Sequence, residues 1–181
     1  MDNNYVADTV FEDRNFGKLP LITGVYEGCT FKNCSVEKVN LSGCQFIETT
    51  FADCNISLAN IANTVFNAVH FSDCKMTGLI FGEANKFGLL FSFDDCSLNH
   101  SSFYNTHIKN THFKNCQIKE VDFSNCNAKG VVFYNCDLGR AIFDNTNLEE
   151  ADFSTALNFS IDPENNKLKK AMFSQHSLDG L

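Results

Sequence analysis

The chain has 181 residues, of which 44% are apolar, and it carries a formal net charge of −8 at neutral pH. This length is ample for one domain with a buried core. The acidic balance disfavours direct nucleic-acid binding, which requires a positive face, and no run of about 18 apolar residues is present to span a membrane.

The first ten residues are polar and contain no basic stretch followed by an apolar one. We therefore expect no signal peptide. We interpret residues 1–10 as a loose leader that precedes a repeat domain at residues 11–155.

A four-residue motif, Phe-x-(Asn/Asp)-Cys, recurs through that domain. It begins at Phe31, Phe51, Phe71, Phe93, Phe113 and Phe133, so that the steps are 20, 20, 22, 20 and 20 residues. A fixed period of this kind indicates a solenoid, in which each repeat stacks on its neighbours.

The period of 20 divides into four periods of five. Counted in fives from Phe31 to Phe81 and from Phe93 to Phe153, all 24 positions are apolar. The position two before each holds all nine cysteines and otherwise mostly small residues. A period of five fits neither an amphipathic helix nor an ordinary strand. It predicts square coils with a large and a small column inside, stacked as parallel strands about 4.8 Å apart, with Asn, Asp and Gly at the corners.

The beginning and the middle of the domain depart from this pattern. Residues 11–26 keep the register of five, but Arg14 and Leu19 stand where small residues are expected, so we predict a distorted first coil that caps the N-terminal end. The repeat then breaks at residues 82–92, where Phe93 arrives two residues late. A small loop is expected at residues 84–88. Phe87 either turns inward to fill the widened corner or is exposed, and we favour the inward position because exposed large apolar residues usually need a partner.

The last coils are the most regular. Between residues 93 and 155 Phe alternates with smaller aliphatic residues, which predicts Phe on two opposite sides of each coil. Residues 11–153 make about seven coils, a rod of roughly 34 Å. Residues 156–181 lose the pattern, and we expect a loop over the C-terminal end at 156–170, a final strand at 171–174 and a short tail. Four apolar residues at this end suggest a homodimer interface: Met172, Phe173, Leu178 and Leu181.

Residues typical of catalysis and metal binding are sparse. No phosphate-binding loop, nucleophile elbow or zinc motif is present, so we expect a non-enzymatic protein without a cofactor. His100, His107 and His112 are interpreted as solvated surface residues, because no third metal ligand can be nominated. The cysteines are interpreted as inert core thiols rather than disulfides or metal ligands, and unpaired thiols imply a reducing, cytoplasmic location.

The acidic residues allow two interpretations. The densest cluster comprises Asp144, Glu149, Glu150 and Asp152. It is either a solvated surface that keeps the rod soluble or part of a partner-binding surface. In the second case the partner would also contact the break, at Glu83, Asn85, Lys86 and Phe87.

The repeat resembles the pentapeptide-repeat family. Three stretches carry the resemblance: Ala151-Asp152-Phe153-Ser154, Val121-Asp122-Phe123-Ser124 and Ala141-Ile142-Phe143-Asp144-Asn145. The resemblance covers about residues 9–155. It implies an all-β fold, a right-handed quadrilateral parallel β-helix with a mid-chain break and an irregular C-terminal cap, but it describes only the scaffold and says little about function.

Within that family, residues 74–81 and the mid-chain break resemble the quinolone-resistance group of the Qnr and MfpA type. This resemblance implies a DNA-mimicking rod that binds the type II topoisomerases gyrase and topoisomerase IV, protects them from quinolones and dimerises through C-terminal elements. The chain departs from that group, because its break adds only two residues and five basic residues interleave with its acids: Lys109, Lys114, Lys119, Lys129 and Arg140. The alternative is a scaffold or adaptor protein with another partner.

Overall fold

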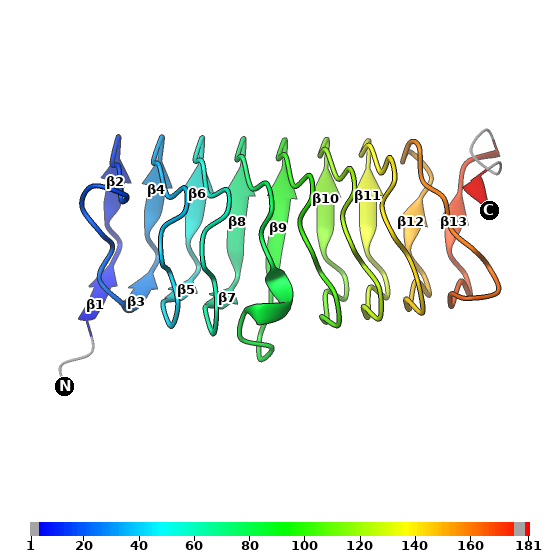
Figure 1. Cartoon of the computed structure of the whole chain (residues 1–181), viewed down its shortest axis with the longest axis horizontal. Helices are drawn as coiled ribbons and strands as arrows, with labels where there is room; N and C mark the ends of the chain where they lie inside the picture. The colour runs from blue at the N-terminus through cyan, green and yellow to red at the C-terminus, as the bar shows by residue number, and fades with distance from the viewer. Residues whose placement is uncertain (1–3, 176–179) are drawn as a thin grey trace.

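A computed structural model describes residues 4–175 and 180–181. The chain forms a straight rod of stacked coils, with the N-terminal and C-terminal ends at opposite ends of the stack (Figure 1). The elements are β1 (Asn4–Ala7), β2 (Val10–Glu12), β3 (Gly24–Glu27), β4 (Thr30–Lys32), β5 (Gln45–Ile47), β6 (Thr50–Ala52), β7 (Val65–Asn67), β8 (Val69–Ser72), the 3₁₀ helix η1 (Phe81–Glu83), β9 (Phe91–Asp94), β10 (His112–Lys114), β11 (Val132–Tyr134), β12 (Asp152–Phe153) and β13 (Met172–Phe173).

The coils have four sides, which we number in chain order. Side 1 is a parallel sheet of nine strands in the order β13-β12-β11-β10-β9-β8-β6-β4-β2. Side 2 is the row of single parallel bridges from Asn15 to Leu157, and side 3 includes the row from Ile80 to Ile142. Side 4 begins as the sheet β1-β3-β5-β7 and continues after the mid-chain break as a row of bridges from His107 to Lys167.

The parallel β-helix expected from the period of five is confirmed. The register places Phe31 beside Phe51 and Phe93 beside Phe113. Nine strands on side 1 make eight turns, one more than the seven counted between residues 11 and 153, because β13 adds Phe173 to the column.

The core is built from stacked aromatic rings. On side 1 the Phe31 and Phe51 ring centres lie 4.7 Å apart with 11° between the planes. On the opposite side the Phe103 and Phe123 rings lie 5.2 Å apart with 3° between the planes. The prediction that Phe occupies two opposite sides is therefore confirmed for the last coils. Each fully buried Phe contributes roughly 1.5–3 kcal/mol, so this column is the main source of stability.

The corners require a backbone that most residues avoid. Asn33, Asp53 and Asn115 have φ values of 49°, 54° and 54° at equivalent corners. Asn and Asp tolerate this left-handed region better than other L residues. The corner side chains also bond along the rod, since Asn115 Nδ2 donates to Asp95 Oδ1 at 3.1 Å and Asn135 Nδ2 donates to Asn115 Oδ1 at 2.9 Å.

The N-terminal end differs from the loose leader expected at residues 1–10. Asn4–Ala7 form strand β1, which pairs in parallel with β3. Val6 packs against the core, and it lies five residues before Phe11, so it extends the large column by one place. The outermost strands at this end are therefore β1 and β2 rather than residues 11–26 alone. Arg14 and Leu19, which interrupt the small column, are both exposed.

The C-terminal end is covered by residues 156–175. Phe159 and Ile161 are buried there, and the Phe173 ring stacks on Phe153 with 5.4 Å between the centres. Lys167 pairs with Asn147 before the chain reaches β13. No helix within the described ranges is long and apolar enough to cross a membrane.

Candidate functional site

The mid-chain break is a loop at residues 84–90 that follows η1 on side 4. It extends beyond the line of the neighbouring turns, below β9 in Figure 1. Asn85 N donates to Thr64 O at 2.9 Å and Leu90 N donates to Phe66 O at 3.0 Å, so the loop is held by the preceding coil. In the described part of the chain, no hydrogen bond joins the loop to the following coil at His107–Lys109. The loop therefore interrupts the ladder of side 4.

The expectation that Phe87 turns inward is wrong. Its side chain is 89% exposed at the tip of the loop. The widened corner is filled instead by Phe91, which is buried and lies 5.1 Å from the Phe93 ring centre and 5.5 Å from that of Phe81. Phe91 stands in the small column, so one large ring replaces a small side chain there and uses the space that the two extra residues create.

A hollow of about 390 Å³ lies beside the Phe87 ring. It is lined by Asn63, Gly82, Glu83, Ala84, Asn85, Lys86 and Phe87. Phe87 N donates to Asn85 Oδ1 at 2.9 Å, which fixes the turn at the tip. The four residues nominated from the sequence at the break, Glu83 at the end of η1 and Asn85, Lys86 and Phe87 in the loop, are thus brought together in one surface with an aromatic edge and a polar rim.

The four acidic residues nominated with the loop do not share one side of the rod. Asp144 follows the Phe143 position of side 3, Glu149 lies on side 4, Glu150 is at the next corner, and Asp152 belongs to β12 on side 1. Glu149 and Glu150 lie 4.0 and 3.2 Å from Lys129 Nζ. One flat partner surface therefore cannot contact all four acids at once.

A different set of acids does align. Asp53, Asp73 and Asp95 occupy the same corner, after side 1, in three successive coils, with φ near 54° at each. We call these residues the aspartate column. None of the three forms a salt bridge with a basic residue in the described ranges. The sequence carried this signal, since the aspartates are the third residues of the FADC, FSDC and FDDC motifs.

The apolar residues nominated for a dimer interface lie at the C-terminal end. Met172 and Leu181 are exposed, whereas Phe173 is half-buried and belongs to the end of the side 1 ring column. Leu178 lies outside the described residues. The exposed part of this patch within the described chain is therefore smaller than the sequence suggested.

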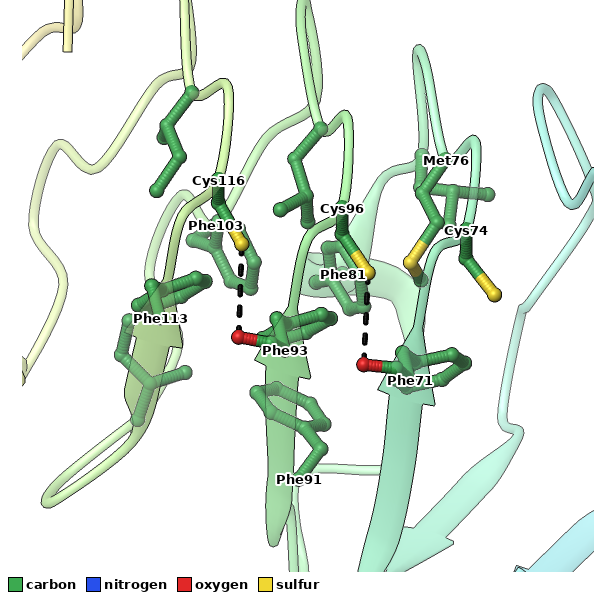
Figure 2. Close-up of a cluster of buried hydrophobic side chains, with 14 of the residues drawn as sticks. Phe71, Cys74, Met76, Phe81, Phe91, Phe93, Cys96, Phe103, Phe113 and Cys116 are labelled. Carbon is green, nitrogen blue, oxygen red and sulfur yellow. Dashed lines mark hydrogen bonds between the residues drawn. The ribbon is translucent and has the colours of Figure 1, made fainter. Parts of the chain in front are cut away.

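The cysteines are confirmed as buried and free. Six of them, Cys34, Cys54, Cys74, Cys96, Cys116 and Cys136, form one column at the start of side 2. Cys96 Sγ donates to Phe71 O and Cys116 Sγ donates to Phe93 O, each at 3.5 Å (Figure 2). Burial raises the pKa of the Cys126 thiol, on side 4, to about 11. The six thiols of the side 2 column are small core residues that donate to backbone carbonyls, whereas the Cys126 thiol lies 3.3 Å from the Thr106 hydroxyl.

The nominated histidines point outward, as expected: His100, His107 and His112 are exposed. His100 Nδ1 lies 3.3 Å from Glu120 Oε2. His70 was not nominated from the sequence; its Nδ1 lies 2.9 Å from Ser92 Oγ and its Nε2 lies 3.8 Å from Asp94 Oδ2. Over residues 4–175 and 180–181, no three His, Cys, Asp or Glu side chains are grouped to hold a metal ion.

Comparisons with known proteins agree with this architecture. A family model described as a pentapeptide repeat region matches residues 26–92 and 89–154. No curated protein sequence matches the chain. A crystal structure of HetL, a pentapeptide repeat protein involved in heterocyst differentiation regulation from the cyanobacterium Nostoc sp. strain PCC 7120, is similar with a TM-score of 0.54 and 12% identity, over 94% of this chain and 86% of HetL.

A trypsin-treated form of QnrB1, described as a plasmid-mediated fluoroquinolone resistance protein, is similar with a TM-score of 0.50 and 17% identity, over 94% of this chain and 92% of that one. At these identities the structural similarity concerns the fold alone. Because the family model covers most of the coils, and these neighbours share the right-handed quadrilateral β-helix, the chain belongs to the pentapeptide-repeat family.

Proposed function

We propose that the chain is a non-catalytic binding rod that holds a partner protein on side 4, around the loop at residues 84–90. The observation that carries this proposal is the exposure of Phe87, an aromatic ring that the core does not use. Exposed aromatic rings with a polar rim are typical anchors of protein interfaces. The hollow beside the ring and the polar groups of Asn85 and Lys86 supply such a rim.

A site-specific photo-crosslinker tests this role. Benzoylphenylalanine replaces Phe87 in one variant and Tyr134, an exposed aromatic residue on side 1, in the control. In cells that express the protein, we expect one discrete adduct from position 87 and none from position 134. The absence of an adduct at position 87, or the same adducts from both positions, would contradict the proposal.

A second candidate names the partner as a type II topoisomerase, gyrase or topoisomerase IV, bound by DNA mimicry. The aspartate column favours it, because Asp53, Asp73 and Asp95 place three carboxylates on adjacent coils, about 4.8 Å apart along the rod. The fold similarity to the fluoroquinolone resistance protein QnrB1 is consistent with this partner. Against it, the column is short, because the same corner carries Asn33 in the coil before it and Asn115 and Asn135 in the coils after it, and the other acids are spread over several sides.

A gyrase supercoiling assay in the presence of a fluoroquinolone tests the second candidate. If the topoisomerase is the partner, equimolar protein restores supercoiling, and the variant Asp53→Asn/Asp73→Asn/Asp95→Asn loses this effect. The control variant Asp122→Asn/Asp144→Asn/Asp162→Asn has the same change of charge away from the column. If the parent protein neither restores nor inhibits supercoiling, the topoisomerase is excluded as the partner. The binding rod then has another partner.

A further inference from the structure

Side 4 beyond the loop carries the opposite charge to the molecule as a whole. Lys109, Lys129, Glu149 and Lys169 each lie two residues after the bridge row His107, Asn127, Asn147 and Lys167. They therefore occupy the same outward position in four successive coils. We call Lys109, Lys129, Lys167 and Lys169 the lysine face. Together with Glu149 this surface has a net charge of +3, in a chain with a net charge of −8.

Most of that charge is not neutralised within the molecule. Lys129 Nζ lies 3.2 Å from Glu150 Oε1 and 4.0 Å from Glu149 Oε2. Lys109, Lys167 and Lys169 are exposed and form no salt bridge with any acid in the described ranges. Three lysines that share one side of a rod repel one another in the free protein, and a bound anionic group relieves this repulsion.

The spacing indicates the size of the ligand. Lys109 and Lys169 are three coils apart, which is about 14 Å at the spacing of parallel strands. An extended peptide advances about 3.3–3.6 Å per residue, so four or five residues cover this distance. A short acidic segment therefore fits the length of the face.

We propose that the lysine face binds an acidic, extended segment of a partner protein that lies along the rod next to Phe87. This inference rests on the proposed function, because both place the partner on side 4, and it adds the charge of the partner segment. An acidic peptide is favoured over nucleic acid, since Glu149 and Glu150 lie within or beside the face and the whole chain repels a polymer with one charge every 1.7 Å. The face also has the wrong sign to mimic DNA.

Fluorescence anisotropy with a labelled peptide of six glutamates tests the inference. We compare the parent chain with Lys109→Glu/Lys169→Glu, and with the control variant Lys75→Glu/Lys114→Glu, which makes the same change of charge on sides 2 and 1. We expect the first variant to weaken binding at least tenfold and the control by less than threefold. Binding of the parent should weaken as salt rises through 0.15 M, where the Debye length is about 8 Å.

Three results would overturn the inference. The first is that the parent binds the glutamate peptide no more tightly than a labelled peptide of six glutamines. The second is that both charge variants weaken binding equally. The third is that the parent binds a single-stranded oligonucleotide of six bases more tightly than the glutamate peptide. Thermal unfolding of each variant confirms that it is folded. The peptide-binding experiment tests only the lysine face, and the crosslink at position 87 tests only the loop. A failure of the further inference can therefore be distinguished from a failure of the proposed function.

Discussion

The ring of Phe93 lies parallel to the ring of Phe113, with 4.9 Å between the ring centres and 3° between the planes. The two residues are 20 positions apart and pair in the register of β9 and β10. Phe113 also contacts the Phe133 ring at 5.2 Å on its other side. Each ring in the middle of the column is therefore covered from both directions by the coils before and after it.

The substitution Phe113→Ala should lower the free energy of unfolding by about 3–5 kcal/mol, because it leaves a cavity between two coils that cannot collapse onto each other. Chemical denaturation measures this loss. Tyr134→Ala removes an exposed aromatic residue one coil away and should change stability by less than about 0.5 kcal/mol. A loss below about 1 kcal/mol for Phe113→Ala would contradict the role of the ring column.

Phe87 and Phe91 form a matched pair for testing the mid-chain break. Phe91→Ala should cost about 3–5 kcal/mol, since its ring fills the widened corner. Phe87→Ala should change the free energy of unfolding by less than about 0.5 kcal/mol, because its ring is almost fully exposed. Chemical denaturation of the two variants under the same conditions shows which of the two rings contributes to the core. Equal losses would show that Phe87 also packs on the core.

Stability should fall as the pH rises above about 8.5. Burial raises the pKa of Cys126 to about 11, whereas a thiol in an unfolded chain titrates near 8.5. Below 8.5 both states keep the proton, and between 8.5 and 11 only the unfolded state releases it, so the thiol's contribution is lost with rising pH. For Cys126 this amounts to on the order of 3 kcal/mol.

Urea unfolding at pH 7, 9 and 10.5 with a phosphine reductant measures this dependence. Cys126→Ser introduces a side chain that does not ionise in this range, so its stability should fall less steeply with pH than that of the parent. Buried Tyr26, with a pKa raised to about 12 by burial, adds to the decline only above about pH 10 in both proteins. Identical losses of stability for the two proteins between pH 7 and 10.5 would refute the assignment to this thiol.

Leu58 occupies a corner that suits asparagine better. Its φ is 57° and its side chain is 53% exposed, and the left-handed region costs roughly 1–2 kcal/mol for most L residues. Leu58→Asn should therefore raise the free energy of unfolding by about 0.5–1 kcal/mol. The matched control is Leu157→Asn on side 2, where the leucine is 55% exposed and is not one of the residues with a positive φ. A gain at Leu157, or a loss at Leu58, would show that corner strain is not the cause.

The regular coils could be read from the sequence because the interior positions repeat every five residues. Phe31, Phe51 and Phe113 each have only one place in such a coil, and the structure puts them there. The path of the chain at the break was harder to predict, because two extra residues can be absorbed at any point between Phe81 and Phe93. Whether Phe87 or Phe91 fills the widened corner depends on the path of the backbone around it. The period of five contains no information about this path.

The candidate site was less predictable for a related reason. Asp144 and Asp152 are eight residues apart in the sequence, yet they lie on opposite sides of the rod because the chain turns two corners between them. Conversely, Lys109 and Lys169 are 60 residues apart and share one side. Which charges lie together depends on the side of the coil that carries them and not on their proximity in the sequence, and this holds for the lysine face as well. The strand before residue 11 could also have been predicted, since Val6 lies five residues before Phe11 and continues the large column.

The loop at residues 84–90 leaves the rest of the molecule in register. Phe71 pairs with Phe93 in the same way as Phe93 pairs with Phe113, although the first pair is 22 residues apart and the second is 20. The number of coils therefore sets the length of the rod, and a corner of side 4 is the place where the number of residues can vary while the strands of side 1 stay in register. A segment of different length or sequence can be spliced there, which makes the rest of the stack a fixed frame for displaying a variable surface.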